Sequence, residues 1–170
     1  PIADLVNDVA STHSTIYSSC DITSFFWTLP LKESARNPTI FTAPSGQKFR
    51  FRVCPFGLVN SPGYASLTLL QALSKLRGKV WYYVDDIVTA DLDDMDSHLE
   101  KLRALFSELS TYRLKLNARK CVFLSDHVIF LGHRIDKDGY QIVSKYSTDI
   151  IRSWPSPKRS KEHTSELQSL

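Results

Sequence analysis

The chain has 170 residues, 42% of them hydrophobic, which is enough to bury one hydrophobic core. Its net charge of +3 is compatible with a nucleic-acid partner but does not require one. Its apolar runs fall short of the roughly 20 residues that a membrane span requires, and no charged-then-apolar leader marks secretion. The spacing of the three cysteines, Cys20, Cys54 and Cys121, is not that of a metal site. We expect them to be reduced and packed as small hydrophobic side chains in an intracellular protein. No membrane partner is expected.

The first third of the chain predicts a helix, a strand and a hairpin. Apolar residues at helical spacing predict a helix within residues 1–10. Residues 15–18 predict a strand that leads to Asp21. Two more strands, 39–43 and 48–53, are predicted on either side of a Pro-Ser-Gly-Gln turn.

A helix and a second hairpin are predicted in the middle of the chain. Ser61 is expected to be the N-cap of the helix, with Pro62 at the first helical position and an end near Leu76. Two apolar runs, 80–83 and 87–90, predict the strands of the hairpin.

A long helix and several short strands are predicted next. Asp94 or Asp96 caps the helix, which carries one leucine-rich face. A further helix is expected over residues 145–153. The predicted short strands are 122–124, 128–131, 134–135 and 140–142. Because helices and antiparallel strands mix without strict alternation, the expected fold class is α+β.

Two adjacent carboxylates interrupt the apolar strands of the second hairpin, in the stretch Tyr83-Val84-Asp85-Asp86. Carboxylates are depleted in strands and costly to bury unpaired, so this pair is expected at the hairpin tip. Asp21 ends an earlier strand, and we expect it to face Asp85 across a gap that one or two Mg²⁺ ions could fill. The alternatives are a surface turn for the pair and a turn or helix-cap role for Asp21.

Five motifs in order resemble the reverse transcriptase domain of a gypsy-type long-terminal-repeat retrotransposon polyprotein. They are Asp21-Ile22-Thr23-Ser24-Phe25-Phe26, Cys54-Pro55-Phe56-Gly57-Leu58-Val59-Asn60-Ser61-Pro62, Tyr83 to Asp86, Leu114 to Cys121, and Phe130-Leu131-Gly132-His133. The resemblance covers residues 1–158. It implies a polymerase palm, a ferredoxin-like antiparallel sheet with helices on one face, together with part of the fingers and the start of the thumb.

The resemblance also implies roles for individual residues. Asp21, Asp85 and Asp86 would be catalytic and bind two Mg²⁺ ions, or Mn²⁺ in their place. The nucleotide site would include Phe26, which selects deoxyribose, with Phe56, Gly57 and Lys120. Tyr83, Leu131 and Gly132 would contact the primer. The plain alternatives are a core aromatic for Phe26, a solvated lysine for Lys120 and a buried hairpin for Leu131-Gly132. His98 and His133 are interpreted as structural.

The expected partners follow from the resemblance. They are an RNA or DNA template with its primer, deoxynucleoside triphosphates, and the ribonuclease H, integrase and protease regions of a polyprotein in a cytoplasmic retrotransposon particle. One alternative function is an RNA-dependent RNA polymerase, although the aromatic Phe26 argues against the use of ribonucleotides. A second alternative is an inactive remnant that only binds nucleic acid or packs within a polyprotein. Residues 159–170 resemble a translated sequencing adapter and are expected to be non-native. We expect the chain on its own not to polymerise.

Overall fold

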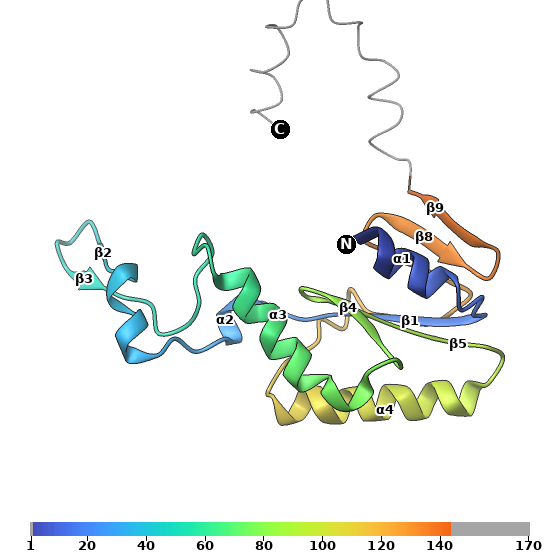
Figure 1. Ribbon diagram of the computed structural model, residues 1–170. Coiled ribbons are helices and arrows are strands. Elements are labelled where there is room, and N and C mark those ends of the chain that lie inside the picture. Colours follow the sequence, from blue (N-terminus) through green and yellow to red (C-terminus); the bar gives the residue numbers. More distant parts are fainter. Residues whose placement is uncertain (1, 144–170) are drawn as a thin grey trace, which may run out of the picture.

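A four-stranded antiparallel sheet forms the centre of the computed structural model, which describes residues 2–143 (Figure 1). Its strands stand in the order β4-β5-β1-β6. Their bounds are β1 Ile16–Asp21, β4 Trp81–Tyr83, β5 Asp86–Asp91 and β6 Val122–Ser125. The connection from β1 to β4 includes one long helix together with shorter elements, and a single helix connects β5 to β6, which gives the ferredoxin-like order and confirms the predicted α+β palm.

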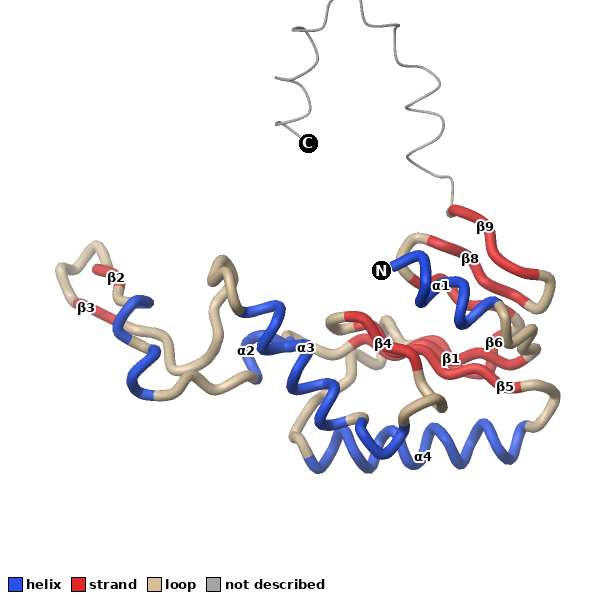
Figure 2. Tube along the Cα trace, viewed as in Figure 1, coloured by secondary structure: helices blue, strands red, loops and turns tan. Residues whose placement is uncertain are grey.

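Two helices, α3 Ser61–Ala72 and α4 Met95–Thr111, cover one face of this sheet (Figure 2). Side chains alternate between the faces of a strand, so β1 and β5 each send every second residue toward the helices. The core on this side contains Cys20, Ile22, Ile87, Leu69, Leu73, Leu105 and Leu109. The helical spacing of the leucines in α3 and α4 therefore matches their burial.

The opposite face is covered at one end by α1 Ile2–Ala10 and by a second, three-stranded antiparallel sheet. The strands of the second sheet are β7 His127–Phe130, β8 His133–Asp136 and β9 Gly139–Ile142. This second core contains Val6, Val9, Ala10, Tyr17, Val88, Ala90, Val128, Phe130 and Ile135. The palm helices α3 and α4 thus share one face as expected, while α1 lies on the other.

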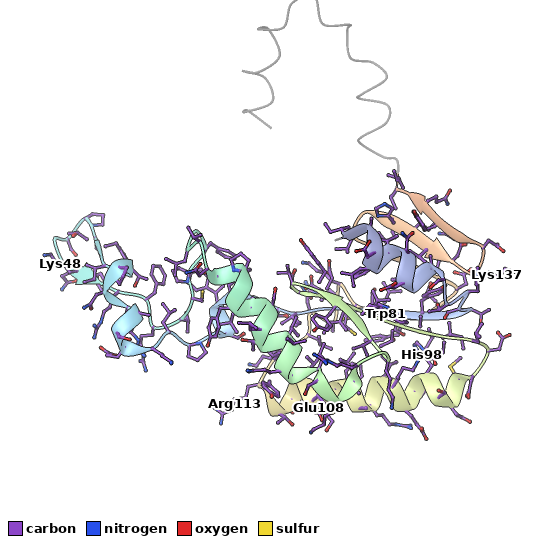
Figure 3. All side chains as sticks on the ribbon, viewed as in Figure 1. Lys48, Trp81, His98, Glu108, Arg113 and Lys137 are labelled. Carbon is purple, nitrogen blue, oxygen red and sulfur yellow. The ribbon has the colours of Figure 1, made fainter. Side chains whose placement is uncertain are left out.

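A lobe projects from the sheet and ends in a short hairpin, with Lys48 at its far end (Figure 3). It begins at α2 Phe25–Thr28 and carries the hairpin strands β2 Phe41–Thr42 and β3 Lys48–Phe49. These strands are shorter than the predicted 39–43 and 48–53. The residues before β2, Asn37–Thr39, form a 3₁₀ turn, and the Thr39 hydroxyl accepts a hydrogen bond from the Phe51 backbone at 3.0 Å.

The predicted helix caps have mixed outcomes. Asp94 caps α4, since its Oδ1 accepts a hydrogen bond from Ser97 N at 3.0 Å. The prediction that Ser61 is an N-cap is wrong, because Ser61 is the first helical residue and Asn60 precedes it. The Ser61 hydroxyl instead lies 2.8 Å from Cys54 Sγ in the core. The predicted helix at 145–153 and the tail 159–170 lie outside the described residues.

The predicted helix over residues 61–76 is also divided. The α-helix ends at Ala72, and a 3₁₀ turn, Ser74–Leu76, continues the chain. Among residues 2–143, none of the helices combines the length and the apolarity needed to cross a membrane.

Candidate active site

The second hairpin carries the two adjacent carboxylates at its tip, as the sequence predicts. Tyr83 pairs with Asp86, so Val84 and Asp85 form a two-residue turn. Val84 has a positive φ of 55°, which the tight turn requires. The apolar runs on either side become β4 and β5, and the chain reverses where the carboxylates are.

Strand pairing brings Asp21 and Asp86 together. The register of β1 and β5 places these two residues directly opposite one another. Opposite residues of an antiparallel pair project from the same face of the sheet. This face is the one opposite α3 and α4, and it is open around the two carboxylates. The residue paired with Asp21 is therefore Asp86, and Asp85 lies one residue earlier, in the turn.

Asp85 is fixed in the turn by its backbone. Its carbonyl oxygen accepts a hydrogen bond from Ile22 N at 2.9 Å, which ties the hairpin tip to the end of β1. The negative charge of Asp85 is close enough to raise the pKa of both Asp86 and Lys120. Asp21, Asp85 and Asp86 therefore form one electrostatic cluster.

Lys120 is the cation of this cluster. Its Nζ lies 3.0 Å from Asp21 Oδ2. The hydrogen bond to Asp21, followed by the charge of Asp21, raises the pKa of Lys120, so its ammonium group stays protonated at neutral pH. The turn before Lys120 is held by the Asp21 carbonyl, which accepts a hydrogen bond from Asn117 N at 2.9 Å.

Desolvation and neighbouring carboxylates together raise the pKa of Asp86. Desolvation is the largest cause, and the charges of Asp85 and Asp21 add to it, while Lys120 opposes the shift. The residue surface of Asp86 is open to the cleft, yet enough protein surrounds the carboxyl group to disfavour its charge. A divalent cation would relieve this repulsion, and carboxylate oxygens are the hard ligands that Mg²⁺ prefers. Within residues 2–143, however, no group of three or more His, Cys, Asp or Glu side chains forms a ready-made metal site.

A cleft of about 180 Å³ is lined by Asp21 and Asp86, and Asp85 is not among its lining residues. Asp21, Asp86 and Lys120 line its polar side, and Ile129 and Phe130 of β7 line another. The next two residues, Leu131 and Gly132, form the turn between β7 and β8, with φ values of 51° and 78°. The predicted primer-contacting turn therefore directly follows a strand that borders the carboxylates. Tyr83 is 41% exposed at the end of β4.

The structure also brings together the aromatic members of the predicted nucleotide site. Phe26 is half-buried against the core, and its ring centroid lies 5.4 Å from that of Phe56. Phe56 is 66% exposed. Gly57 has a φ of 90°, and a Cβ there would meet no atom within 4 Å, so the backbone conformation and not crowding calls for glycine.

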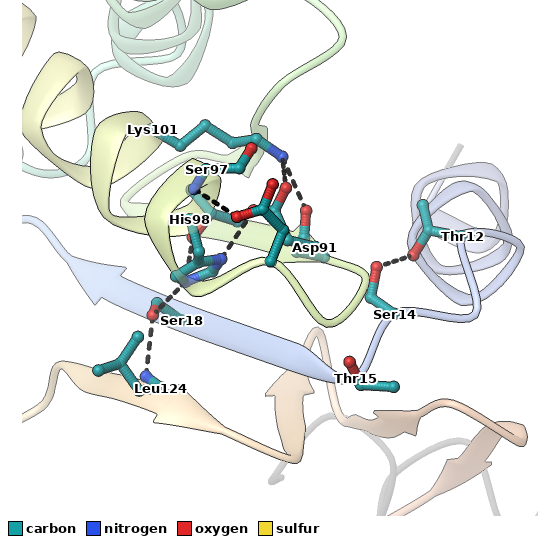
Figure 4. A network of polar contacts seen from close by, with 12 residues as sticks. Thr12, Ser14, Thr15, Ser18, Asp91, Ser97, His98, Lys101 and Leu124 are labelled. Carbon is teal, nitrogen blue, oxygen red and sulfur yellow. Dashed lines mark hydrogen bonds and ion pairs between the residues drawn. The ribbon is translucent and has the colours of Figure 1, made fainter.

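A buried polar network behind the site was not predicted from the sequence (Figure 4). His98 on α4 is fully buried, with Nε2 2.8 Å from Ser18 Oγ and Nδ1 2.8 Å from Asp91 Oδ2. Lys101 Nζ lies 2.6 Å from the other Asp91 oxygen, and Ser18 Oγ accepts from Leu124 N at 3.1 Å. The available signal was the presence of the polar residues Ser18, Thr89 and Asp91 within strands β1 and β5. The network agrees with the structural role predicted for His98.

Sequence and structure comparisons point to one family. The model of the family described as "Reverse transcriptase (RNA-dependent DNA polymerase)" matches residues 3–135. An enzymatic polyprotein of figwort mosaic virus is 30% identical over 149 residues, covering 88% of this chain and 22% of that protein. The Pol polyprotein of Drosophila melanogaster transposon 412 is 33% identical over 144 residues, covering 83% of this chain and 11% of that protein.

Solved structures agree with these sequence relatives. The foamy viral protease-reverse transcriptase in complex with an RNA/DNA hybrid aligns with a TM-score of 0.79 and 26% identity, covering 96% of this chain and 22% of that one. A second foamy viral structure, in complex with double-stranded DNA, has a TM-score of 0.78 and 28% identity, covering 92% of this chain and 26% of that one. The chain thus spans about a quarter or less of each of these four relatives. It belongs to the reverse transcriptase (RNA-dependent DNA polymerase) family.

Proposed function

We propose that this chain is the catalytic palm of an RNA-directed DNA polymerase, which transfers deoxynucleotides to a primer 3′-hydroxyl under the direction of a template. The observation that carries the proposal is the pairing of Asp21 with Asp86 at the hairpin tip, in a cleft that also holds Lys120. Family membership supports the reaction class. The Drosophila melanogaster transposon 412 polyprotein supports a retrotransposon origin, and the motif set favours the gypsy type.

Asp21, Asp85 and Asp86 are the residues that would hold divalent cations, two Mg²⁺ ions with Mn²⁺ as a substitute. When bound, such ions supply charge neutralisation at the attacking hydroxyl and the leaving phosphate oxygen. The three carboxylates supply the negative charge, and the raised pKa of Asp86 reflects first its desolvation and then the charges of Asp85 and Asp21. Lys120 lies 3.0 Å from Asp21 and offers a positive charge to the triphosphate.

The aromatic residues position the nucleotide in this proposal. Phe26 forms the floor under the sugar and excludes a 2′-hydroxyl, while the exposed ring of Phe56 and the open backbone at Gly57 lie under the base. Contact between the Phe26 and Phe56 rings, with centroids 5.4 Å apart, supports a shared surface.

The primer terminus would rest between two hairpins. Tyr83 contributes from the end of β4, and Leu131 and Gly132 contribute from the turn after β7. Support comes from the cleft, because Ile129 and Phe130 of β7 line it together with the carboxylates.

The wider context is also part of the proposal. The partners are an RNA or DNA template with its primer, deoxynucleoside triphosphates, and the ribonuclease H, integrase and protease regions of a polyprotein in a cytoplasmic particle. Residues 1–158 form the palm with part of the fingers and the start of the thumb, and residues 159–170 are a non-native, adapter-derived tail.

Primer extension by the reverse transcriptase region that contains this chain tests the proposal. Asp85→Asn should lower the extension rate at least on the order of 10²-fold, the scale of losing one group that stabilises transition-state charge. The melting temperature and primer–template binding should change little, because Asp85 lies in a turn and outside both cores.

Asp138→Asn is the matched control, since Asp138 lies in the exposed turn between β8 and β9. Equal extension by Asp85→Asn and Asp138→Asn would refute the catalytic assignment. Primer–template binding without extension by the unsubstituted protein would favour the inactive remnant.

A further inference from the structure

Two cysteines stand side by side directly behind the Asp21–Lys120 ion pair. Strands β1 and β6 are antiparallel, with Ser19 paired to Val122. Extending this register by one residue brings Cys20 beside Cys121, and the side chains of the neighbouring Asp21 and Lys120 form an ion pair at 3.0 Å. The two side chains of Cys20 and Cys121 are in contact, because burial, followed by the charge and the side-chain hydrogen bond of Cys121, raises the pKa of the Cys20 thiol to about 12.

Both cysteines lie on the helix side of the sheet. Cys20 is 3% exposed within the core beneath α3 and α4, and Cys121 packs against that same core while keeping part of its surface open to solvent. Both thiols are free. The side chains alternate, so Asp21 and Lys120 project into the cleft while the two sulfurs meet on the other side.

The local backbone can accommodate a bond between the sulfurs. Opposite residues of an antiparallel pair have Cβ atoms about 4.5–5.5 Å apart, while a disulfide needs about 3.5–4.5 Å. The remaining movement is small. Cys121 precedes the regular part of β6, which begins at Val122, and the β1–β6 ladder has an irregularity between Tyr17 and Ser19. Such irregular pairing leaves room for this adjustment.

We propose that Cys20 and Cys121 are a site of oxidative modification, a dithiol that hydrogen peroxide converts to a disulfide. The more exposed Cys121 sulfur attacks one peroxide oxygen, which breaks the O–O bond, forms a sulfenic acid and releases one water. The Cys20 sulfur then displaces the hydroxyl group from Cys121, so an S–S bond forms as the S–O bond breaks. The thiol proton leaves with the hydroxide as a second water. Two thiols are oxidised and one peroxide is reduced.

The disulfide acts on the cleft through the residues next to it in sequence. Cys20 precedes Asp21, and Cys121 follows Lys120. A covalent link between the cysteines fixes the two backbones and holds the Lys120 ammonium group over the Asp21 carboxylate. A divalent cation must displace that ammonium group, so oxidation weakens cation binding. This second step rests on the proposed function, whereas disulfide formation does not.

Peptide mapping by mass spectrometry under non-reducing conditions tests the site in the full 170-residue chain. After peroxide treatment we expect a peptide that links Cys20 to Cys121 and disappears on reduction. Cys121→Ser and Cys20→Ala should each abolish it. Cys54→Ala should retain it, because Cys54 is buried beside Ser61, which its sulfur contacts at 2.8 Å. A chain in which only sulfinic acid or a Cys54 crosslink forms would overturn the proposal.

Mn²⁺ titration followed by electron paramagnetic resonance tests the coupling. The oxidised chain should bind Mn²⁺ about two- to fivefold more weakly than the reduced chain. This factor corresponds to the interaction free energy of an exposed ion pair, which the cation must disrupt. The difference should vanish in Cys121→Ser. Equal affinities of a mapped disulfide form and the reduced form would overturn the coupling alone. A reduced chain that fails to bind Mn²⁺ would instead refute the metal assignment, and peptide mapping would still decide the dithiol.

Discussion

At the scale of single residues, Phe26 is the side chain on which nucleotide choice depends in the proposed function. It is half-buried, and its ring contacts those of Phe25 and Phe56. Phe26→Val removes most of the ring, so a ribonucleotide 2′-hydroxyl would no longer meet it. We expect the preference for deoxynucleotides over ribonucleotides to fall at least about tenfold, the scale of contacts worth 1–3 kcal/mol in a pocket.

Competitive incorporation of matched deoxy- and ribonucleotides measures this preference. Phe49→Val is the matched control, because Phe49 lies on the projecting hairpin and is 48% exposed. Unchanged discrimination in Phe26→Val would leave Phe26 as a core residue only.

Tyr17 is a second residue whose structure has a measurable consequence. Its ring is fully buried in the core under α1, and its hydroxyl group has no hydrogen-bond partner among the described residues. An unsatisfied buried hydroxyl costs about 1–3 kcal/mol. Tyr17→Phe should therefore leave stability unchanged or raise it by up to about 1 kcal/mol, because the same ring remains packed.

The pH dependence gives an independent check on Tyr17. Burial, with a smaller contribution from the charge of Asp136, raises the pKa of Tyr17 from 10.0 to about 12. The folded state therefore holds the phenol proton more tightly than the unfolded state. Its contribution to stability is fully present below pH 10 and is lost as the pH rises from 10 to about 12. Urea unfolding across this range should show a steeper loss for the original chain than for Tyr17→Phe, and parallel curves would contradict the buried, unpaired hydroxyl.

At the scale of secondary-structure elements, helix α4 is joined to the sheet by the His98 network. His98→Ala would leave the Ser18 hydroxyl and the Asp91 carboxylate without their imidazole partner, and it would open a cavity. We expect a loss of about 2–4 kcal/mol in the free energy of unfolding, since both buried partners lose a hydrogen bond. Asp94→Ala removes only the helix cap and should cost about 1 kcal/mol.

Chemical denaturation of both variants measures the difference. His127→Ala is the control, because the His127 side chain bonds to its exposed neighbour Asp126 and should change stability by less than about 0.5 kcal/mol. If His98→Ala matched His127→Ala, the network would not hold α4.

The elements also show what sequence can and cannot predict. The hairpin with Asp85 and Asp86 was predictable, because carboxylates are depleted in strands and two of them between two apolar runs therefore indicate a turn. The pairing of Asp21 with Asp86, and not with Asp85, depends on a register that turn geometry and long-range pairing decide together. The partners of His98 were not predictable, because they come from strands 80 and 7 residues away in sequence and meet only when α4 packs.

At the scale of the whole molecule, the sheet and the projecting lobe differ in how they are supported. Strands β1 and β5 lie between two cores, and each pairs with neighbours on both sides. The hairpin of β2 and β3 is a separate two-stranded sheet whose facing rings, Phe41 and Phe49, are each 48% exposed. An isolated two-stranded hairpin is marginally stable in water.

Hydrogen–deuterium exchange measures this difference along one chain. We expect the amides of β1 and β5 to open only with global unfolding, whose free energy is about 5–15 kcal/mol for a domain. The amides of β2 and β3 should exchange at least about a hundredfold faster, because local opening of the hairpin exposes little buried apolar surface. The β7–β8–β9 sheet is the internal control, since it is also small but is packed against α1 and should be protected. Protection of β2 and β3 equal to that of β1 and β5 would mean that the lobe and the palm unfold as one cooperative unit.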